Sequence, residues 1–442
     1  MTQWNWLDAT AAAQALRDGA LSAQMLVEAC IERVQAVDAD VQAWAFFDPE
    51  HARSQARALD QQRKEGKPLG ALHGLPVGIK DIIDTADMPT EDGTVLHAGR
   101  RPSADAAVVA ALRSAGAIVF GKTVTTELAT YTPGKTRNPH NPRHTPGGSS
   151  SGSAAAVAAG MVPLALGTQT NGSVIRPAAL CGVVGFKPSH GVVPRTGILR
   201  QSRALDTVGV MARSVPDAAL ILQCIAGYDA GDPDSRPSAR VDYARIAAEE
   251  PPLPPTLAFV RTPVWDRIDA ESSAAFDELI AHLGDRVETL ELPATLAAAW
   301  DWHRTIMEAD IAASFVVEYE RGAERLSASL RKQIERGRAT LAFDYLEALA
   351  HVARLNESFA PIYDRVDALV TPAAPGAAPE GLDRTGDPAF CTLWTLCGMP
   401  AITLPLLSAG NGLPIGVQLV GRRGDDARLL RTAHWLVRHL QE

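Results

Sequence analysis

Apolar positions in the first half of the chain alternate between helix-like and strand-like spacing. Over 22–34 they recur every three or four residues behind Ser22, whose side chain suits a helix cap. Short apolar runs predict strands at 76–80, 117–120 and 162–166, with helices at 105–114 and 150–159 between them. This alternation is typical of an α/β sheet that helices cover on both faces.

A proline-rich stretch at 251–254 marks a change in composition. Beyond it, the pattern predicts strands at 256–260, 287–292, 368–370, 401–404 and 415–420, a long helical region at 295–359 and a terminal helix at 426–440. Because strands resume at the end of the chain, we expect the second half to complete the same sheet. The prediction is a single large α/β domain whose central twisted sheet is mixed and mostly parallel. Its parts are N-terminal helices at 1–70, a core at 71–220, a variable helical region at 221–367, and closing strands and a helix at 368–442.

Composition and charge exclude several classes of protein. Of the 442 residues, 46% are hydrophobic and 21% are charged, which suffices for a large core. The net charge of −9 argues against a nucleic-acid partner, and no apolar run reaches the ~20 residues that a membrane span needs. The five cysteines are scattered and lack C-x-x-C spacing, which favours reduced thiols over disulfides or a zinc site. We therefore expect a cytoplasmic protein without a leader peptide.

Glycine and serine are concentrated at the start of the helix predicted at 150–159. Gly147 and Gly148 precede three serines there, and such glycines expose backbone N–H groups at low conformational cost. A phosphate-binding loop or a simple helix cap would fit the same pattern. However, the segment lacks the G-K-[ST] of a Walker loop and the G-x-G-x-x-G of a dinucleotide site.

A second tight turn, at 170–173, ends in Ser173 and follows a predicted strand. A serine in such a turn has several backbone N–H groups around it, as a nucleophile beside an oxyanion hole requires. A purely structural turn fits this short stretch equally well.

A nucleophilic serine requires a base, and no Ser–His–acid order can be read from the nearby histidines. The other candidate is Lys80, which closes the apolar strand 76–80. Burial would disfavour its charged form and lower its pKa towards the range of a general base. A lone lysine at a strand end is more often a surface residue, so both interpretations stay open at this point. No H-E-x-x-H or similar pattern predicts a metal site.

Together these segments resemble the amidase signature family. The resemblance rests on the Gly/Ser-rich run 147–188 and on Gly78-Ile79-Lys80-Asp81. It extends to 119–127 (VFGKTVTTE), 205–210 (LDTVGV) and 413–421 (LPIGVQLVG), in the family's order over nearly the whole chain. The separations of 69 residues between Lys80 and Ser149, and of 24 between Ser149 and Ser173, are usual for the family.

The resemblance implies a Ser–cis-Ser–Lys triad. Ser173 matches the family's acyl-enzyme nucleophile, and Lys80 matches the base. Ser149 matches the bridging serine, whose peptide bond to Gly148 is cis in relatives; Gly148 is also expected to contact the substrate. The implied oxyanion hole consists of the backbone N–H groups of Thr170, Asn171, Gly172 and Ser173.

The turn before Ser173 departs from the family pattern. Where the family has D-x-G-G-S, this chain has Gln169-Thr170-Asn171-Gly172-Ser173. Asparagine tolerates a positive φ better than other non-glycine residues, so we expect the turn to survive. The Asn171 side chain either adds a polar contact or narrows the pocket. With the following Val-Ile-Arg, these residues look most like the malonamidase branch, whose substrates are small amides.

Arg176 lies three residues beyond Ser173, beside Pro177, where a helix is expected to begin. Two interpretations are open. Arg176 forms a structural ion pair with Asp206, or its guanidinium binds a substrate carboxylate through parallel N–H groups.

The resemblance implies an amidohydrolase that needs no cofactor and no metal, acts on a small-molecule amide and is compatible with a homodimer. We expect its selectivity to depend on the loop 128–136 and the helical region 300–345. The side chains of Trp300, Trp302, Met307 and Phe315 either line an apolar pocket or pack in the helix core. The alternatives are an A-type component of a tRNA-dependent amidotransferase, or a hydrolase whose main substrates are carbamates, anilides or esters.

Overall fold

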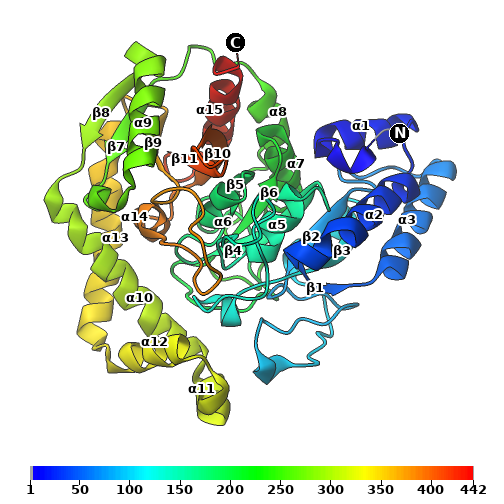
Figure 1. Cartoon of the computed structure of the whole chain (residues 1–442), viewed down its shortest axis with the longest axis horizontal. Helices are drawn as coiled ribbons and strands as arrows, with labels where there is room; N and C mark the ends of the chain where they lie inside the picture. The colour runs from blue at the N-terminus through cyan, green and yellow to red at the C-terminus, as the bar shows by residue number, and fades with distance from the viewer. Residues whose placement is uncertain (1–2, 442) are drawn as a thin grey trace.

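A computed structural model describes residues 3–441, in which eleven strands form one sheet that runs through the molecule (Figure 1). Their spatial order is β1-β3-β2-β4-β6-β5-β10-β11-β9-β7-β8. The strands are β1 (Trp44–Phe47), β2 (Pro76–Lys80), β3 (Ile118–Thr123), β4 (Leu164–Gln169), β5 (Val184–Lys187), β6 (Thr207–Ala212), β7 (Leu257–Arg261), β8 (Val287–Glu291), β9 (Ala368–Pro372), β10 (Ala401–Ser408) and β11 (Pro414–Val420). The two halves of the chain therefore share one sheet, as the sequence predicts.

Helices cover both faces of this sheet. Apolar side chains of α2, α4, α7 and α15 form the core on one face, and those of α10, α12, α13 and α14 form the core on the other. The helices are α1 (Ala9–Asp18), α2 (Ala23–Val41), α3 (Pro49–Lys64), α4 (Ala107–Ser114), α5 (Ser151–Ala158), α6 (Ile175–Leu180), α7 (Val215–Ile225), α8 (Tyr243–Ala248), α9 (Ala270–Leu283), α10 (Ala298–Ser314), α11 (Val316–Gly322), α12 (Ala328–Ala339), α13 (Ala342–Tyr363), α14 (Ala389–Leu396) and α15 (Asp426–His439). The predicted α/β class with a mixed sheet is confirmed.

The expectation that the sheet is mostly parallel is wrong. Of the ten pairings between its strands, six are antiparallel and four are parallel. The difference arises where β6 inserts between β4 and β5, antiparallel to both, and where β10 and β11 form a hairpin. Apolar runs predict that a strand exists, but they carry no information on its direction.

Most predicted elements are present with their ends shifted by a few residues. The expectation that 1–70 holds helices alone is wrong, because the short strand β1 lies within this region and pairs with β3. Strand β2 spans 76–80 as predicted, whereas β4 continues to Gln169, beyond the predicted end at 166. The predicted cap of α2 is confirmed, because the Ser22 hydroxyl accepts the N–H of Met25 at 3.1 Å. None of the helices within 3–441 combines the length and the apolar character that crossing a membrane requires.

The helical region predicted at 295–359 consists of α10 to α13. These helices form an arm beside the second half of the sheet, and α11 and α12 project from the body of the molecule at the end of that arm (Figure 1). We call α10–α13 the helical arm below.

Candidate active site

Lys80 is the last residue of β2, which lies between β3 and β4 in the first half of the sheet. Its side chain is fully buried, so the alternative that it is a surface lysine is wrong. The Nζ atom donates to Ser149 Oγ at 2.7 Å and to Thr168 Oγ1 at 2.8 Å. Burial holds the pKa of Lys80 well below its usual range, and the negative charge of Asp206 opposes that shift only in part. The side chain therefore has the environment of a neutral amine.

Ser149 lies in the loop before α5, where the Gly148–Ser149 peptide bond is cis. Gly147 has a φ of +81°, and a Cβ at this position would lie 2.7 Å from the Cα of Pro177, so only glycine fits. The loop is fixed to β4 through Ser150, whose hydroxyl accepts the N–H of Thr168 and donates to its carbonyl, both at 3.2 Å. These contacts hold the Ser149 hydroxyl against Lys80.

The turn that carries Ser173 follows β4 directly. The backbone N–H of Ser150 donates to the Ser173 carbonyl at 3.3 Å, so the two Gly/Ser segments lie side by side. At the end of β4, Gln169 Oε1 accepts the N–H groups of Val174 and Ile175 at 2.8 and 3.0 Å. Gln169 therefore caps α6 and closes the turn from inside.

Helix α6 begins at Ile175, two residues before the predicted start at Pro177. The proline occupies the third helical position, where its missing N–H costs nothing because the first turn of a helix has no internal acceptor for it. The cap by Gln169, which spans five residues of sequence, allows this earlier start.

Asn171 does not adopt the positive φ that asparagine tolerates. Neither Asn171 nor Gly172 is among the residues with positive φ, so the turn takes a conformation open to any residue. Within residues 3–441, the backbone N–H groups of Asn171, Gly172 and Ser173 have no protein acceptor. N–H groups that lack a protein acceptor beside a serine are available to stabilise an oxyanion.

Arg176 is buried beneath this turn. Its Nη2 donates to the Gly148 carbonyl at 2.7 Å and to Thr385 Oγ1 at 3.2 Å, so Arg176 and Gly148 lie together as the candidate substrate contacts. Its Nε and Nη1 are buried and have no partner in the part of the chain that the structure describes. Burial lowers the pKa of Arg176, while Tyr131 and Asp387 are among the groups that oppose the shift.

The predicted ion pair between Arg176 and Asp206 does not form. The Asp206 carboxylate accepts instead from Thr170 Oγ1 at 2.6 Å and from the backbone N–H groups of Gln201 and Ser202 at 2.8 and 3.0 Å. Burial raises the pKa of Asp206 to about 6. Local bonds to the following loop satisfy this carboxylate, so Asp206 is not available to Arg176.

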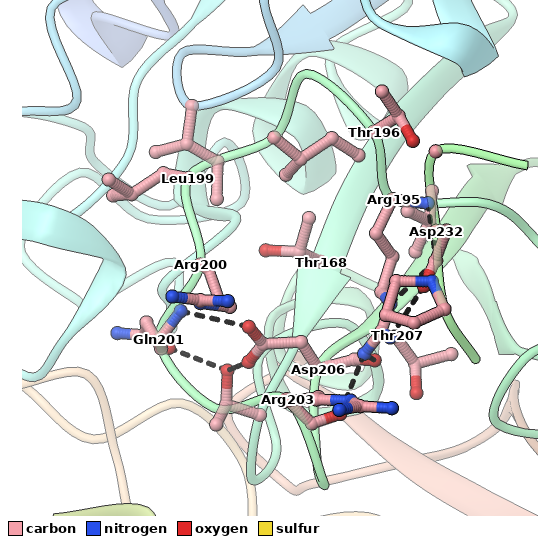
Figure 2. A pocket seen from close by; sticks show the side chains of 16 residues that line it. Thr168, Arg195, Thr196, Leu199, Arg200, Gln201, Arg203, Asp206, Thr207 and Asp232 are labelled. Atoms are coloured by element: carbon pink, nitrogen blue, oxygen red, sulfur yellow. Dashed lines mark hydrogen bonds and ion pairs between the residues drawn. The ribbon is translucent and has the colours of Figure 1, made fainter. Parts of the chain in front are cut away.

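A cavity of about 230 Å³ adjoins the Lys80 side of the site. Figure 2 shows Thr168 in the wall of this cavity. Asp206 and Gln201 lie below Thr168 in this view, and Arg195 and Asp232 lie to its right. Thr168 is one of the two hydrogen-bond partners of Lys80. The cavity is therefore separated from the lysine by a residue that contacts it directly.

A second cavity, of about 330 Å³, lies on the other side of the turn and opens between the helical arm and α14. Asn171 and Tyr131 line its inner end. Of the four large apolar side chains predicted for a pocket or the helix core, Trp300 and Met307 line this cavity, whereas Trp302 stacks on His351 and Phe315 is buried in the core. All four side chains contribute to or pack against the core of the helical arm, and two of them also line the pocket.

Several residues of the site carry no signal in the sequence. Thr168 and Tyr131 lie in stretches that pattern alone does not distinguish, and Thr395 of α14 meets Gln169 from more than two hundred residues away. The position of Thr168 on β4, five residues before Ser173, is the one local hint. Within 3–441, no group of three or more His, Cys, Asp or Glu side chains could hold a metal ion.

Comparisons with known proteins identify the family and the fold. The sequence pattern of the family described as Amidase matches residues 25–430. The A component of the glutamyl-tRNA(Gln) amidotransferase of Chloroflexus aggregans is 35% identical, over 98% of this chain and 96% of the relative. The native peptide amidase from Stenotrophomonas maltophilia superposes with a TM-score of 0.87 at 29% identity, over 99% of this chain and 97% of the other. A 6-aminohexanoate cyclic dimer hydrolase does so with a TM-score of 0.88 at 28% identity, over 100% and 98%. This chain belongs to the amidase family.

Proposed function

We propose that this chain is an amidohydrolase that cleaves the C–N bond of a small-molecule amide through an acyl-enzyme on Ser173. The observation that carries the proposal is the fully buried Lys80, whose Nζ contacts Ser149 in a member of this family. A lysine in that environment is disposed to be neutral, and a neutral amine has the lone pair that a base needs.

The proposed reaction begins when the Ser173 hydroxyl attacks the amide carbonyl. Its proton passes to Ser149, which passes its own proton to neutral Lys80. The N–H groups of Asn171, Gly172 and Ser173, with that of Thr170, stabilise the oxyanion, and each such donor is worth ~2.7–4 kcal/mol. The relay then returns a proton to the leaving nitrogen, and ammonia or an amine departs. Water then attacks the acyl-enzyme and gives a proton to the relay, which returns one to the Ser173 oxygen as the acid product leaves.

Arg176 is the proposed anchor for a carboxylate on the substrate. Two of its guanidinium nitrogens are buried without a partner among the described residues, and the acidic residue predicted to pair with it bonds elsewhere. An unpaired buried cation is costly, and a substrate carboxylate would compensate it with charge-assisted hydrogen bonds. The proposed substrates are therefore short amides with a carboxylate near the scissile carbonyl, the substrate type of the malonamidase branch.

The test combines labelling with a substrate screen. A fluorophosphonate should label Ser173 alone, as identified by peptide mass spectrometry, and a screen of primary amides, anilides, carbamates and amidated acids should release ammonia or amine. Labelling at another residue would refute the assignment of the nucleophile. Turnover confined to esters or carbamates would refute the amide substrate and favour that alternative.

A second candidate is a component of an amidotransferase, because the relative from Chloroflexus aggregans carries that name and aligns over nearly its whole length. Such a protein would deliver ammonia to a partner. Affinity purification from the native organism separates the two: a stoichiometric partner protein would favour the amidotransferase, and a lone chain with free turnover would favour the hydrolase.

A further inference from the structure

The side chain of Asn171 connects the loop that carries Tyr131 to helix α14. Its Nδ2 donates to the hydroxyl of Tyr131 at 3.1 Å, and its Oδ1 accepts from the hydroxyl of Thr392 on α14 at 2.8 Å. Its backbone carbonyl accepts from Thr395 Oγ1 at 2.5 Å. Both ends of the amide are thus bonded, so Asn171 holds one position.

The cavity of about 330 Å³ meets the reactive turn at this bonded row, and Ser173 is not among the residues that line the cavity. Tyr131, Asn171 and Thr392 all line that cavity, and Ser173 lies two residues beyond Asn171. The turn is also closely packed at Gly172, where a Cβ would lie 3.0 Å from Pro388, which lines the same cavity, and 3.1 Å from the guanidinium of Arg176. An acyl group at Ser173 can therefore enter this second cavity only where the row opens.

We propose that Asn171, Tyr131 and Thr392 form a gate that limits the length of the acyl group, and that the cavity behind them is an acyl subsite closed off by this gate. The inference rests on the proposed acyl-enzyme at Ser173 and specifies which acyl groups it accepts. Asn171 and its two partners determine specificity here; the backbone N–H of Asn171 keeps its separate role beside the oxyanion.

The lining of the cavity indicates which chains it would hold. Trp300 and Met307 offer apolar surface, and the buried carboxylate of Glu308 is neutralised by a bidentate pair with Arg336. Gln333 also lines the cavity, and its Oε1 is buried with no hydrogen-bond donor near it in the described chain. The subsite would therefore favour an uncharged acyl chain that carries an N–H donor for the Gln333 carbonyl.

Chromogenic esters test the gate directly, because their acyl group reaches Ser173 by the same route. We would measure kcat/KM of wild type and Asn171→Gly on the p-nitrophenyl esters of acetate, hexanoate and N-acetyl-β-alanine. The variant should raise the hexanoate-to-acetate ratio about tenfold, the scale on which pocket shape discriminates chain length. The N-acetyl-β-alanine ester, similar in length to hexanoate but with an N–H, should gain more. Adding Gln333→Leu to Asn171→Gly should remove that extra gain.

The matched control is Asn411→Gly, an exposed turn asparagine far along the chain, which should leave the ratio unchanged. If Asn171→Gly loses acylation altogether, Tyr131→Phe decides, because it removes only the hydroxyl that accepts from Asn171 and should raise the same ratio by a smaller factor. A hexanoate-to-acetate ratio unchanged in the acylating variants refutes the gate alone. Failure of the acetate ester to acylate Ser173 in the wild type refutes the proposed function itself.

Discussion

The first half of the sheet and the helical arm differ in how their polar groups are satisfied. Around Lys80, the lysine, the serines and the end of β4 are buried and bonded to one another through strands and loops close in space. Most charged side chains of the arm lie on its surface, but Glu308 is buried and pairs with Arg336. The arm meets the turn through few contacts. One is the His303 ring, which bonds the Thr170 carbonyl at 3.0 Å.

The arm also makes few hydrogen bonds to the loop after β3. Glu127 accepts the N–H of Ser327 at 3.0 Å, and the hydroxyl of Thr132 donates to that of Ser327 at 2.7 Å. Because the contacts between the two regions are few, we expect substitutions in one region to leave the structure of the other unchanged. A substitution in the buried network should alter whether chemistry occurs, whereas one in the arm should alter which substrate is used and by how much.

The largest expected effect is that of Ser173→Ala. Loss of the nucleophilic hydroxyl should reduce kcat by several orders of magnitude, about 10⁴-fold or more, because members of a relay act as a unit. The melting temperature should stay within about 2 °C of wild type, since little volume is lost. Steady-state turnover and differential scanning calorimetry measure both. Robust turnover by this variant would mean that chemistry does not depend on the turn.

The sequence predicts the buried region better than the arm for a physical reason. Ser149 and Ser173 lie in short glycine- and serine-rich segments, and Lys80 closes a short apolar strand, so local conformation constrains the sequence at all three positions. The partners of Asp206 and Arg176 could not be predicted, because their choice depends on loops that meet only after folding. The direction of the strands could not be predicted either, because it also depends on contacts that form only on folding. Strand β6 inserts antiparallel between β4 and β5, and an apolar pattern carries no information on direction.

The next effect is that of Lys80→Met, which keeps the volume and removes the amine. It should lower kcat by several orders of magnitude, in line with loss of a base in a relay. In the wild type, activity should rise with pH as Lys80 loses its proton, and it should do so well below pH 10.5 because burial lowers the pKa of this lysine. Initial rates over a pH series give the apparent pKa, and a profile that falls through this range would contradict a neutral base.

Lys187→Met is the matched control for the lysine. Lys187 is also fully buried, and burial lowers its pKa to about 8. It donates to the carbonyls of Pro188 and Met399 rather than to a serine. Its loss should therefore lower stability by roughly 1–3 kcal/mol through unsatisfied carbonyls, while the folded fraction keeps its kcat.

Arg176 is the proposed anchor for the substrate beside the buried network, and its variants should have intermediate effects. Arg176→Lys should lower kcat/KM for amidated acids by ~10–100-fold, because a lysine cannot make two parallel bonds to a carboxylate. Simple aliphatic amides should lose little. Competition assays with paired charged and neutral amides measure the ratio. An equal loss for both classes, or a sharp fall in melting temperature, would make Arg176 structural.

The smallest effect should come from the contact between the arm and the loop at 88–100. The His97 ring lies 2.8 Å from Asp92 and 3.1 Å from Glu318 of α11, and Arg100 lies 4.0 Å from the same aspartate. Hydrogen bonds to Asp92 and Glu318 raise the pKa of His97 to about 9. A raised pKa in the folded state means that the contact stabilises fully below the unfolded value of about 6.5 and is lost as pH rises through about 9.

His97→Gln should therefore lower the melting temperature most at about pH 6 and least at about pH 10, where the wild-type ring is already neutral. The Asp92 carbonyl also accepts the N–H of Leu128, which lies in the loop that carries Tyr131. A weaker contact between His97 and Asp92 should therefore also affect the position of Tyr131 in the gate. We expect the variant to change KM by less than about threefold and to leave kcat unchanged, as suits a contact at the edge of the arm. Thermal melts at the two pH values and a Michaelis curve measure these effects. A large fall in kcat would show that the arm and the buried network are not separable, and the distinction drawn between them would have to be given up.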